Sequence, residues 1–108
     1  MKRQETIKFL ADHYGWDSQS RQCIEEMGEL IQALNKYWRK ELKCGKRTFD
    51  NAPVRTPNEK QIIEEIADVE VCLEQLKYLL GCKNMVEDIK DQKADRELHR
   101  IIDGKGTC

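Results

Sequence analysis

Carboxylate side chains recur at helical spacing in two separate stretches of the 108-residue chain. The first stretch contains Glu25, Glu26 and Glu29, and the second contains Glu65 and Asp68. Residues three apart on a helix are surface neighbours, so each stretch can present a carboxylate pair. Two unit charges about 4 Å apart repel by roughly 4 kcal/mol at an effective dielectric constant near 20. If the two stretches pack together, their carboxylates need a cation to remain ionised.

Oxygen-only ligand sets favour a hard cation, Mg²⁺ or Mn²⁺, over zinc. We therefore predict a metal centre whose ligands are Glu26, Glu29, Glu65 and Asp68. Glu25 is a weaker candidate ligand than these four, because its angle on the helix lies further from the apolar stripe and closer to solvent. The alternative is that these acids are the solvated flanks of amphipathic helices, since 36% of the chain is charged.

Apolar residues at steps of three and four predict two long helices that carry the acidic stretches, over about residues 18–42 and 57–80. Thr56, Pro57 and Glu59 form the pattern of a capped helix start, and Gly81 marks the end of that helix. Gly28, inside the first acidic stretch, indicates either close helix packing or a functional role.

Two shorter helices flank the long pair in the prediction. One covers about residues 2–13 and ends in a break over residues 13–17, with Asp17 or Ser18 as the N-cap of the next helix. The other follows Asn84 as its N-cap and runs to about residue 102. It carries Lys93, Arg96 and Arg100 on one face, which is either a solvated stripe or an anion site opposite the carboxylates.

The composition predicts one all-α domain over residues 1–108, with a flexible basic loop at 43–56 and a frayed tail at 103–108. The net charge of −1 excludes a general nucleic-acid-binding surface. No apolar run is long enough for a membrane span, which indicates a cytoplasmic protein. Five cysteines without a Cys-x-x-Cys pair suggest neither a disulfide framework nor a zinc site. Two long apolar stripes exceed what so short a chain can bury, so we expect a partner chain.

The two acidic motifs together resemble the metal-binding signature of the MazG-like, all-α nucleoside triphosphate pyrophosphohydrolases. The signature reads Glu-Glu-x-x-Glu at residues 25–29 and Glu-x-x-Asp at residues 65–68. Gln19 and Gln22 before the first motif, and the basic segment 93–101, extend the likeness to roughly residues 14–102. The linker between the motifs looks longer than is usual in the family, so substrate preference is not carried over.

The resemblance implies a helical bundle of about four helices that is completed by dimerisation, often as a dimer of dimers. It implies Mg²⁺-dependent hydrolysis of a nucleoside or deoxynucleoside triphosphate to the monophosphate and pyrophosphate. The four carboxylates of the predicted metal centre would then be catalytic. Six residues are the corresponding candidates for substrate binding: Gln19, Gln22, Lys36, Lys93, Arg96 and Arg100.

Three other interpretations compete with this one. A di-iron carboxylate bundle requires Glu-x-x-His, but Leu10 and Arg96 stand three residues before His13 and His99. A phosphoribosyl-nucleotide pyrophosphohydrolase of similar fold would use related chemistry. A non-catalytic helical dimerisation module would leave the acids as solvated flanks.

Overall fold

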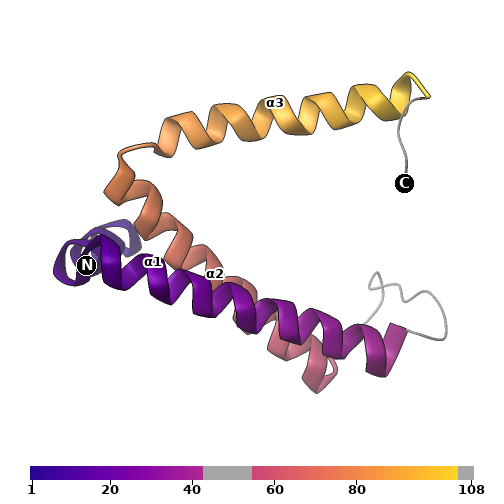
Figure 1. Cartoon of the computed structure of the whole chain (residues 1–108), viewed down its shortest axis with the longest axis horizontal. Helices are drawn as coiled ribbons and strands as arrows, with labels where there is room; N and C mark the ends of the chain where they lie inside the picture. Colours follow the sequence, from indigo (N-terminus) through magenta and orange to yellow (C-terminus); the bar gives the residue numbers. More distant parts are fainter. Residues whose placement is uncertain (43–54, 105–108) are drawn as a thin grey trace.

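The computed structural model describes residues 1–42 and 55–104, and every regular element in this part is helical (Figure 1). The elements are α1 (Arg3–Tyr37), the π-helix η1 (Trp38–Leu42), α2 (Pro57–Leu80) and α3 (Lys83–Ile102). The predicted all-α class is confirmed. The predicted flexible loop and frayed tail lie mostly outside the described residues.

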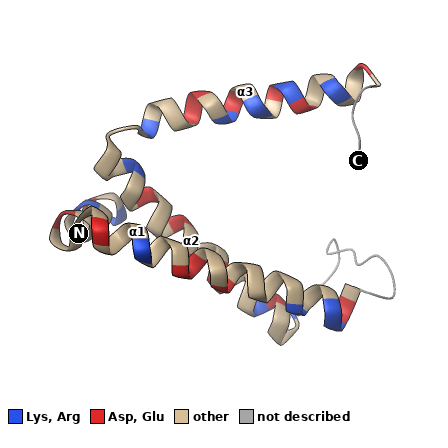
Figure 2. Ribbon diagram, in the orientation of Figure 1, with Lys and Arg blue, Asp and Glu red and all other residues tan. Residues whose placement is uncertain are grey.

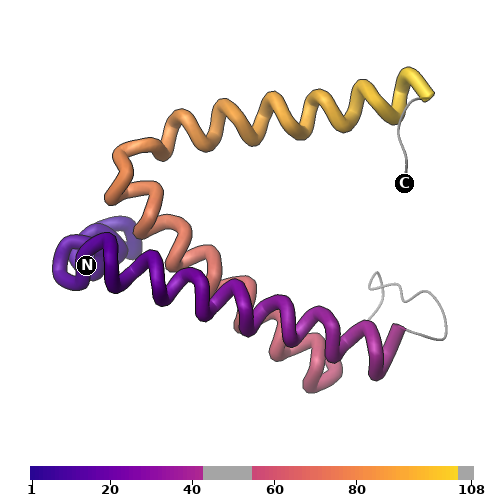
Figure 3. The backbone as a smooth tube through the Cα atoms, viewed as in Figure 1, coloured from indigo at the N-terminus to yellow at the C-terminus, as the bar shows by residue number. Residues whose placement is uncertain are grey.

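Helix α1 is interrupted at Gly15, where φ is 83° and ψ is 173°. A positive φ favours glycine because it has no Cβ. The indigo N-terminal segment in Figure 3 accordingly leaves the line of the longer purple segment. The predicted break is confirmed, but the predicted cap is wrong. Gly15 is the non-helical residue before the longer segment, and within residues 1–42 neither Asp17 nor Ser18 accepts a backbone N–H with its side chain.

Local signals set both ends of α2 as predicted. The hydroxyl of Thr56 accepts a hydrogen bond of 3.2 Å from the Glu59 backbone N–H, and the Glu59 carboxylate accepts one of 2.9 Å from the Thr56 backbone N–H. Gly81 ends the helix in the left-handed conformation, with φ of 63°. The capping box and the glycine stop are therefore confirmed.

Helix α3 begins earlier than predicted. Its N-cap is Cys82, which makes no side-chain capping hydrogen bond, and Asn84 lies inside the first turn. The Asn84 cap was therefore a wrong prediction, because the tight turn at Gly81 lets the chain re-enter a helix at Lys83.

Helices α1 and α2 lie side by side and antiparallel (Figure 1). Two buried hydrogen bonds join them at well-separated levels, Gln19 to Gln75 and Tyr37 to Glu59. The buried apolar core comprises seven side chains, most of them small: Ile7, Ala11, Cys23, Ala33, Tyr37, Val69 and Cys72. The seam between α1 and α2 is what positions the acidic residues of both helices.

Much of the two predicted apolar stripes is exposed in a single chain. Ile24 is 66% exposed and Ile31 58% exposed on α1, and Leu80 is 62% exposed on α2. Helix α3 buries none of its residues and diverges from the other two after the turn that joins it to α2 (Figure 1). A Cβ on Gly28 would meet no heavy atom within 4 Å, so close packing at Gly28 was a wrong prediction for the single chain, because no part of α2 approaches that point.

Candidate metal centre

Three carboxylates converge where α1 faces α2. One carboxylate oxygen from each of Glu26, Glu29 and Glu65 lies within 4.8 Å of the other two. Glu26 and Glu29 are one turn apart on α1, and Glu65 projects from α2. Figure 2 shows the acidic positions of the two helices along their adjoining stretch. The structure therefore brings together residues from both predicted acidic motifs.

The burial of these carboxylates is graded. Glu65 is only 7% exposed, Glu26 is half-buried and Glu29 is exposed. The Oε2 atoms of Glu26 and Glu65 are buried and have no hydrogen-bond partner among the described residues. A buried acceptor without a partner carries a desolvation penalty of about 1–3 kcal/mol, more for a charged group. Both oxygens are thus available to a cation at a site that opens to solvent beside Glu29.

Two glutamines orient the buried carboxylates. Gln22 donates to Oε1 of Glu26 at 2.7 Å, and Gln61 donates to Oε1 of Glu65 at 2.5 Å. Each glutamine stands four residues before its glutamate, which is the helical spacing for side-chain contact. We did not predict Gln61 as a site residue, although the repeated Gln-x-x-x-Glu spacing in the sequence was a signal that could have revealed it. Hydrogen bonds of this kind fix the orientation of metal ligands.

The electrostatics of the cluster raise the pKa of Glu29 above its ordinary value of 4.5. The largest causes are the charges of Glu26 and Glu65, followed by desolvation. Proximity of like charges disfavours the ionised form of a carboxyl group. The three residues therefore repel one another when all are ionised, which is the condition that a bound divalent cation relieves.

Cys23 and Cys72 lie buried in the helix seam near the cluster. Burial raises the pKa of both thiols, and the charge of Glu26 raises both further. Neutral, buried thiols behave as small apolar residues. These cysteines therefore belong to the apolar core of the helix seam.

Two predicted ligands lie outside the group of three. Asp68 is exposed, one turn along α2 from Glu65, and its charge raises the pKa of Cys72. Glu25 is also exposed. Neither contributes an oxygen to the cluster within the described residues.

The candidate substrate-binding residues are dispersed. Gln19 is buried against Gln75, whereas Gln22 lies beside the cluster through Glu26. Lys36 is exposed in the last turn of α1. The three basic residues of α3 are also exposed but lie on a helix that does not contact α1, so one chain does not bring them to the carboxylates: Lys93, Arg96 and Arg100.

None of the described helices is long and apolar enough to cross a membrane. Comparison of the chain with protein-family models, curated proteins and solved structures gives no match. The class of this protein therefore rests on its own features, an all-α chain in which three carboxylates converge between two antiparallel helices.

Proposed function

We propose that the chain is a Mg²⁺-dependent nucleoside triphosphate pyrophosphohydrolase. It would hydrolyse a nucleoside or deoxynucleoside triphosphate to the monophosphate and pyrophosphate. One observation carries this proposal: Glu26, Glu29 and Glu65 converge, and two of their buried oxygens have no partner among the described residues. The resemblance of both acidic motifs to the MazG-like signature supplies the reaction class.

The donor set fits a hard divalent cation, Mg²⁺ or Mn²⁺, because all its atoms are carboxylate oxygens. Glu26, Glu29 and Glu65 would hold the ion, with Asp68 and Glu25 as further candidate ligands. When bound, the ion neutralises phosphate charge and lowers the pKa of a water molecule. Gln22 and Gln61 hold Oε1 of Glu26 and of Glu65 in place, which would leave Oε2 of each residue to bind a cation.

A second copy of the chain completes the site in this proposal, as a homodimer or homotetramer. The exposed apolar side chains of α1, α2 and α3 would be covered by the second copy. The basic stripe of α3 is complementary in charge to the carboxylate cluster but lies away from it in the same chain. Lys93, Arg96 and Arg100 of one copy would therefore neutralise the triphosphate bound at the cluster of the other.

The exposed apolar stripes also favour a second candidate function, a non-catalytic helical dimerisation module. The two candidates differ in their dependence on the metal. A dimerisation module would show no change in activity or melting temperature with Mg²⁺ or Mn²⁺.

The decisive experiment measures pyrophosphate release from all common NTPs and dNTPs with Mg²⁺, with Mn²⁺ and with EDTA. We expect metal-dependent release that is lost in Glu65→Gln and retained in Glu64→Gln. Glu64 is an exposed neighbour on α2 outside the cluster, so it matches the change in charge without touching a ligand. A folded protein that releases no pyrophosphate from any nucleotide would refute the proposed activity.

A mixing experiment tests the contribution of the second copy. Arg96→Ala should raise the Michaelis constant for the nucleotide and leave the Mg²⁺-dependent rise in melting temperature intact. Inactive Glu65→Gln mixed with Arg96→Ala should then yield hybrids with one intact site and recovered affinity. Activity that is merely the average of the two separate variants would show that α3 does not act on the other copy.

A further inference from the structure

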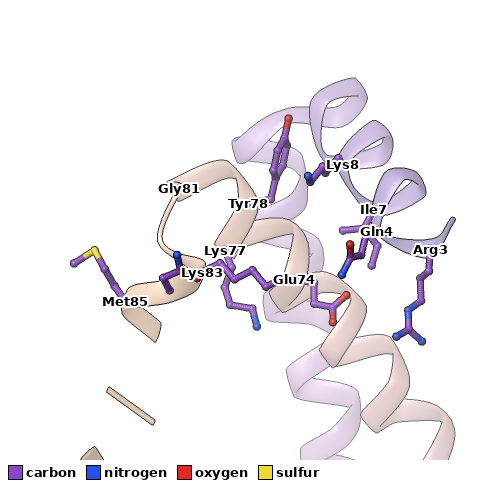
Figure 4. Close-up of a pocket in the computed structure, with 11 residues that line it drawn as sticks. Arg3, Gln4, Ile7, Lys8, Glu74, Lys77, Tyr78, Gly81, Lys83 and Met85 are labelled. Atoms are coloured by element: carbon purple, nitrogen blue, oxygen red, sulfur yellow. The ribbon is translucent and has the colours of Figure 1, made fainter. Parts of the chain in front are cut away.

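A cavity of about 420 Å³ lies where α1 begins, α2 ends and α3 begins (Figure 4). This volume falls within the range of small-molecule sites. Residues of all three helices line it, including Gln4 and Ile7 from α1, Glu74 and Tyr78 from α2, and Met85 from α3. The cavity is separate from the carboxylate cluster, because Glu74 lies nine residues beyond Glu65, which is about 14 Å along the helix.

Positive charge dominates the wall of this cavity. Four cationic side chains line it against the single carboxylate of Glu74: Arg3, Lys8, Lys77 and Lys83. In the part of the chain that the structure describes, Arg3 and Lys83 form no ion pair. The Nζ atom of Lys77 lies 3.9 Å from Glu87 Oε1, a marginal pairing. A local excess of cations in a chain of net charge −1 indicates an anionic ligand.

The backbone of the same wall adds hydrogen-bond donors. Lys83, Asn84 and Met85 line the cavity and form the first turn of α3. The first backbone bond at this end is donated by Val86 to Cys82, and no acidic residue or side-chain cap occupies the turn. Amide groups at a helix start carry partial positive charge and bind phosphates readily.

The cavity also has a fixed aromatic wall. The Tyr78 hydroxyl donates to the Asp12 carboxylate, whose two oxygens lie 2.8 and 3.0 Å away. The Nζ atom of Lys8 lies 5.9 Å from the centroid of the Tyr78 ring. Lys8 and the ring stand together at one end of the cavity in Figure 4, and Lys83 lies beside the turn at Gly81.

We propose that this cavity binds the diphosphate group of a small molecule, either inorganic pyrophosphate or a nucleoside diphosphate. The cations and the start of α3 neutralise and hydrogen-bond the phosphates, and Tyr78 and Ile7 offer apolar surface to any attached nucleoside. The site needs no divalent cation, since its own charge is positive. It does not rest on the proposed hydrolytic function, which uses the carboxylate cluster alone.

The test is calorimetric titration of the full chain with pyrophosphate and with ADP, in EDTA and low salt. Without metal the carboxylate cluster repels both anions, so binding reports on the basic cavity. Arg3→Glu and Lys83→Glu each place an acid in the first turn of a helix, a change that favours the helix. The control is Lys60→Glu, which makes the charge change of one such substitution in the first turn of α2, away from the residues that line the cavity.

We expect the double variant Arg3→Glu with Lys83→Glu to raise the pyrophosphate Kd at least about tenfold, a free-energy change of about 1.4 kcal/mol. Lys60→Glu should change it less than about twofold. If ADP binds more tightly than pyrophosphate, the nucleoside contacts the Tyr78 wall. If the two bind equally, the cavity recognises the diphosphate group alone. No binding at millimolar pyrophosphate, or equal weakening by Lys60→Glu, would overturn the proposal. Loss of binding in Arg96→Glu without loss in the double variant would instead assign the anion to the stripe on α3.

Discussion

The side-chain amide of Gln19 donates a hydrogen bond of 2.6 Å to the side-chain oxygen of Gln75, although 56 positions separate the two residues. Both side chains are buried, with exposed fractions of 8% and 3%. Because this bond satisfies a buried donor on α1 with a buried acceptor on α2, the pair helps to fix how far α1 is shifted along α2. That register determines which glutamates of the two helices face one another. Gln19 therefore contributes to the metal centre by positioning α1 against α2.

Gln19→Ala should therefore destabilise the chain by about 1–3 kcal/mol, because it leaves the buried amide of Gln75 without its partner. Urea unfolding followed by circular dichroism measures this, with Gln32→Ala at an exposed position of α1 as the control. Replacing Gln19 and Gln75 together by leucine should cost less than Gln19→Ala alone. A double variant as unstable as the sum of its single changes would contradict the role of the pair.

The raised pKa of Glu29 predicts a pH dependence of the metal-free protein. The folded chain binds this proton more tightly than the unfolded chain, so the contribution of Glu29 to stability is fully present below its ordinary pKa of 4.5. It is lost as the pH rises through the raised value, when Glu29 ionises beside Glu26 and Glu65.

In EDTA, Glu29→Gln should accordingly melt above the wild type, by a difference that grows as the pH rises from 4.5 through the raised pKa of Glu29. Glu25→Gln is the matched control, since Glu25 is exposed and lies outside the cluster. If the difference in melting temperature between Glu29→Gln and the wild type did not change with pH, repulsion among the carboxylates would not be its cause.

Mg²⁺ should raise the melting temperature of the wild type, because a ligand that binds only the folded state stabilises it. At a free concentration 100 times its Kd, the gain is about 2.7 kcal/mol. Glu65→Gln should lose this effect. Asp68→Asn should lose less of it, because Asp68 lies outside the group of three oxygens. Melting scans at several Mg²⁺ concentrations distinguish the variants, and a full shift in Glu65→Gln would exclude the cluster as the binding site.

Thr56→Ala should destabilise the chain by about 0.5–2 kcal/mol through loss of the α2 cap. The hydroxyl of Thr56 also donates to Glu41 at 2.9 Å, so the change additionally removes a contact between η1 and the start of α2. Thermal unfolding compares it with Thr6→Ala, whose exposed hydroxyl donates only to a backbone carbonyl one turn earlier. Equal effects of the two substitutions would argue against the capping role.

The exposed stripes predict an oligomer, and light scattering should give a mass of at least twice 12.7 kDa. Ile31→Glu should produce monomers, because it places a charge in the apolar face that the second copy would cover. Gln32→Glu introduces a charge at the next, exposed position and should leave the assembly intact. A wild-type monomer at micromolar concentration would refute the prediction.

The sequence alone determined the bounds of α2, through the capping box at Thr56 and the stop at Gly81. It also located the interruption of α1 at Gly15. These signals can be recognised in the sequence because they act within one helical turn. Backbone sterics and local hydrogen bonds there determine where a helix begins and ends. The contacts of Gln22 with Glu26 and of Gln61 with Glu65 are also local, because each joins residues one helical turn apart.

Only the tertiary structure decided which acids meet. Glu26, Glu29 and Glu65 converge while Asp68 stays apart, because the register between α1 and α2 depends on pairs such as Gln19 and Gln75 that are remote in sequence. The direction of α3, and with it the basic cavity, likewise depends on the turn at Gly81. Helical periodicity gives the face on which a side chain lies, but the packing of one helix against another determines what that face meets.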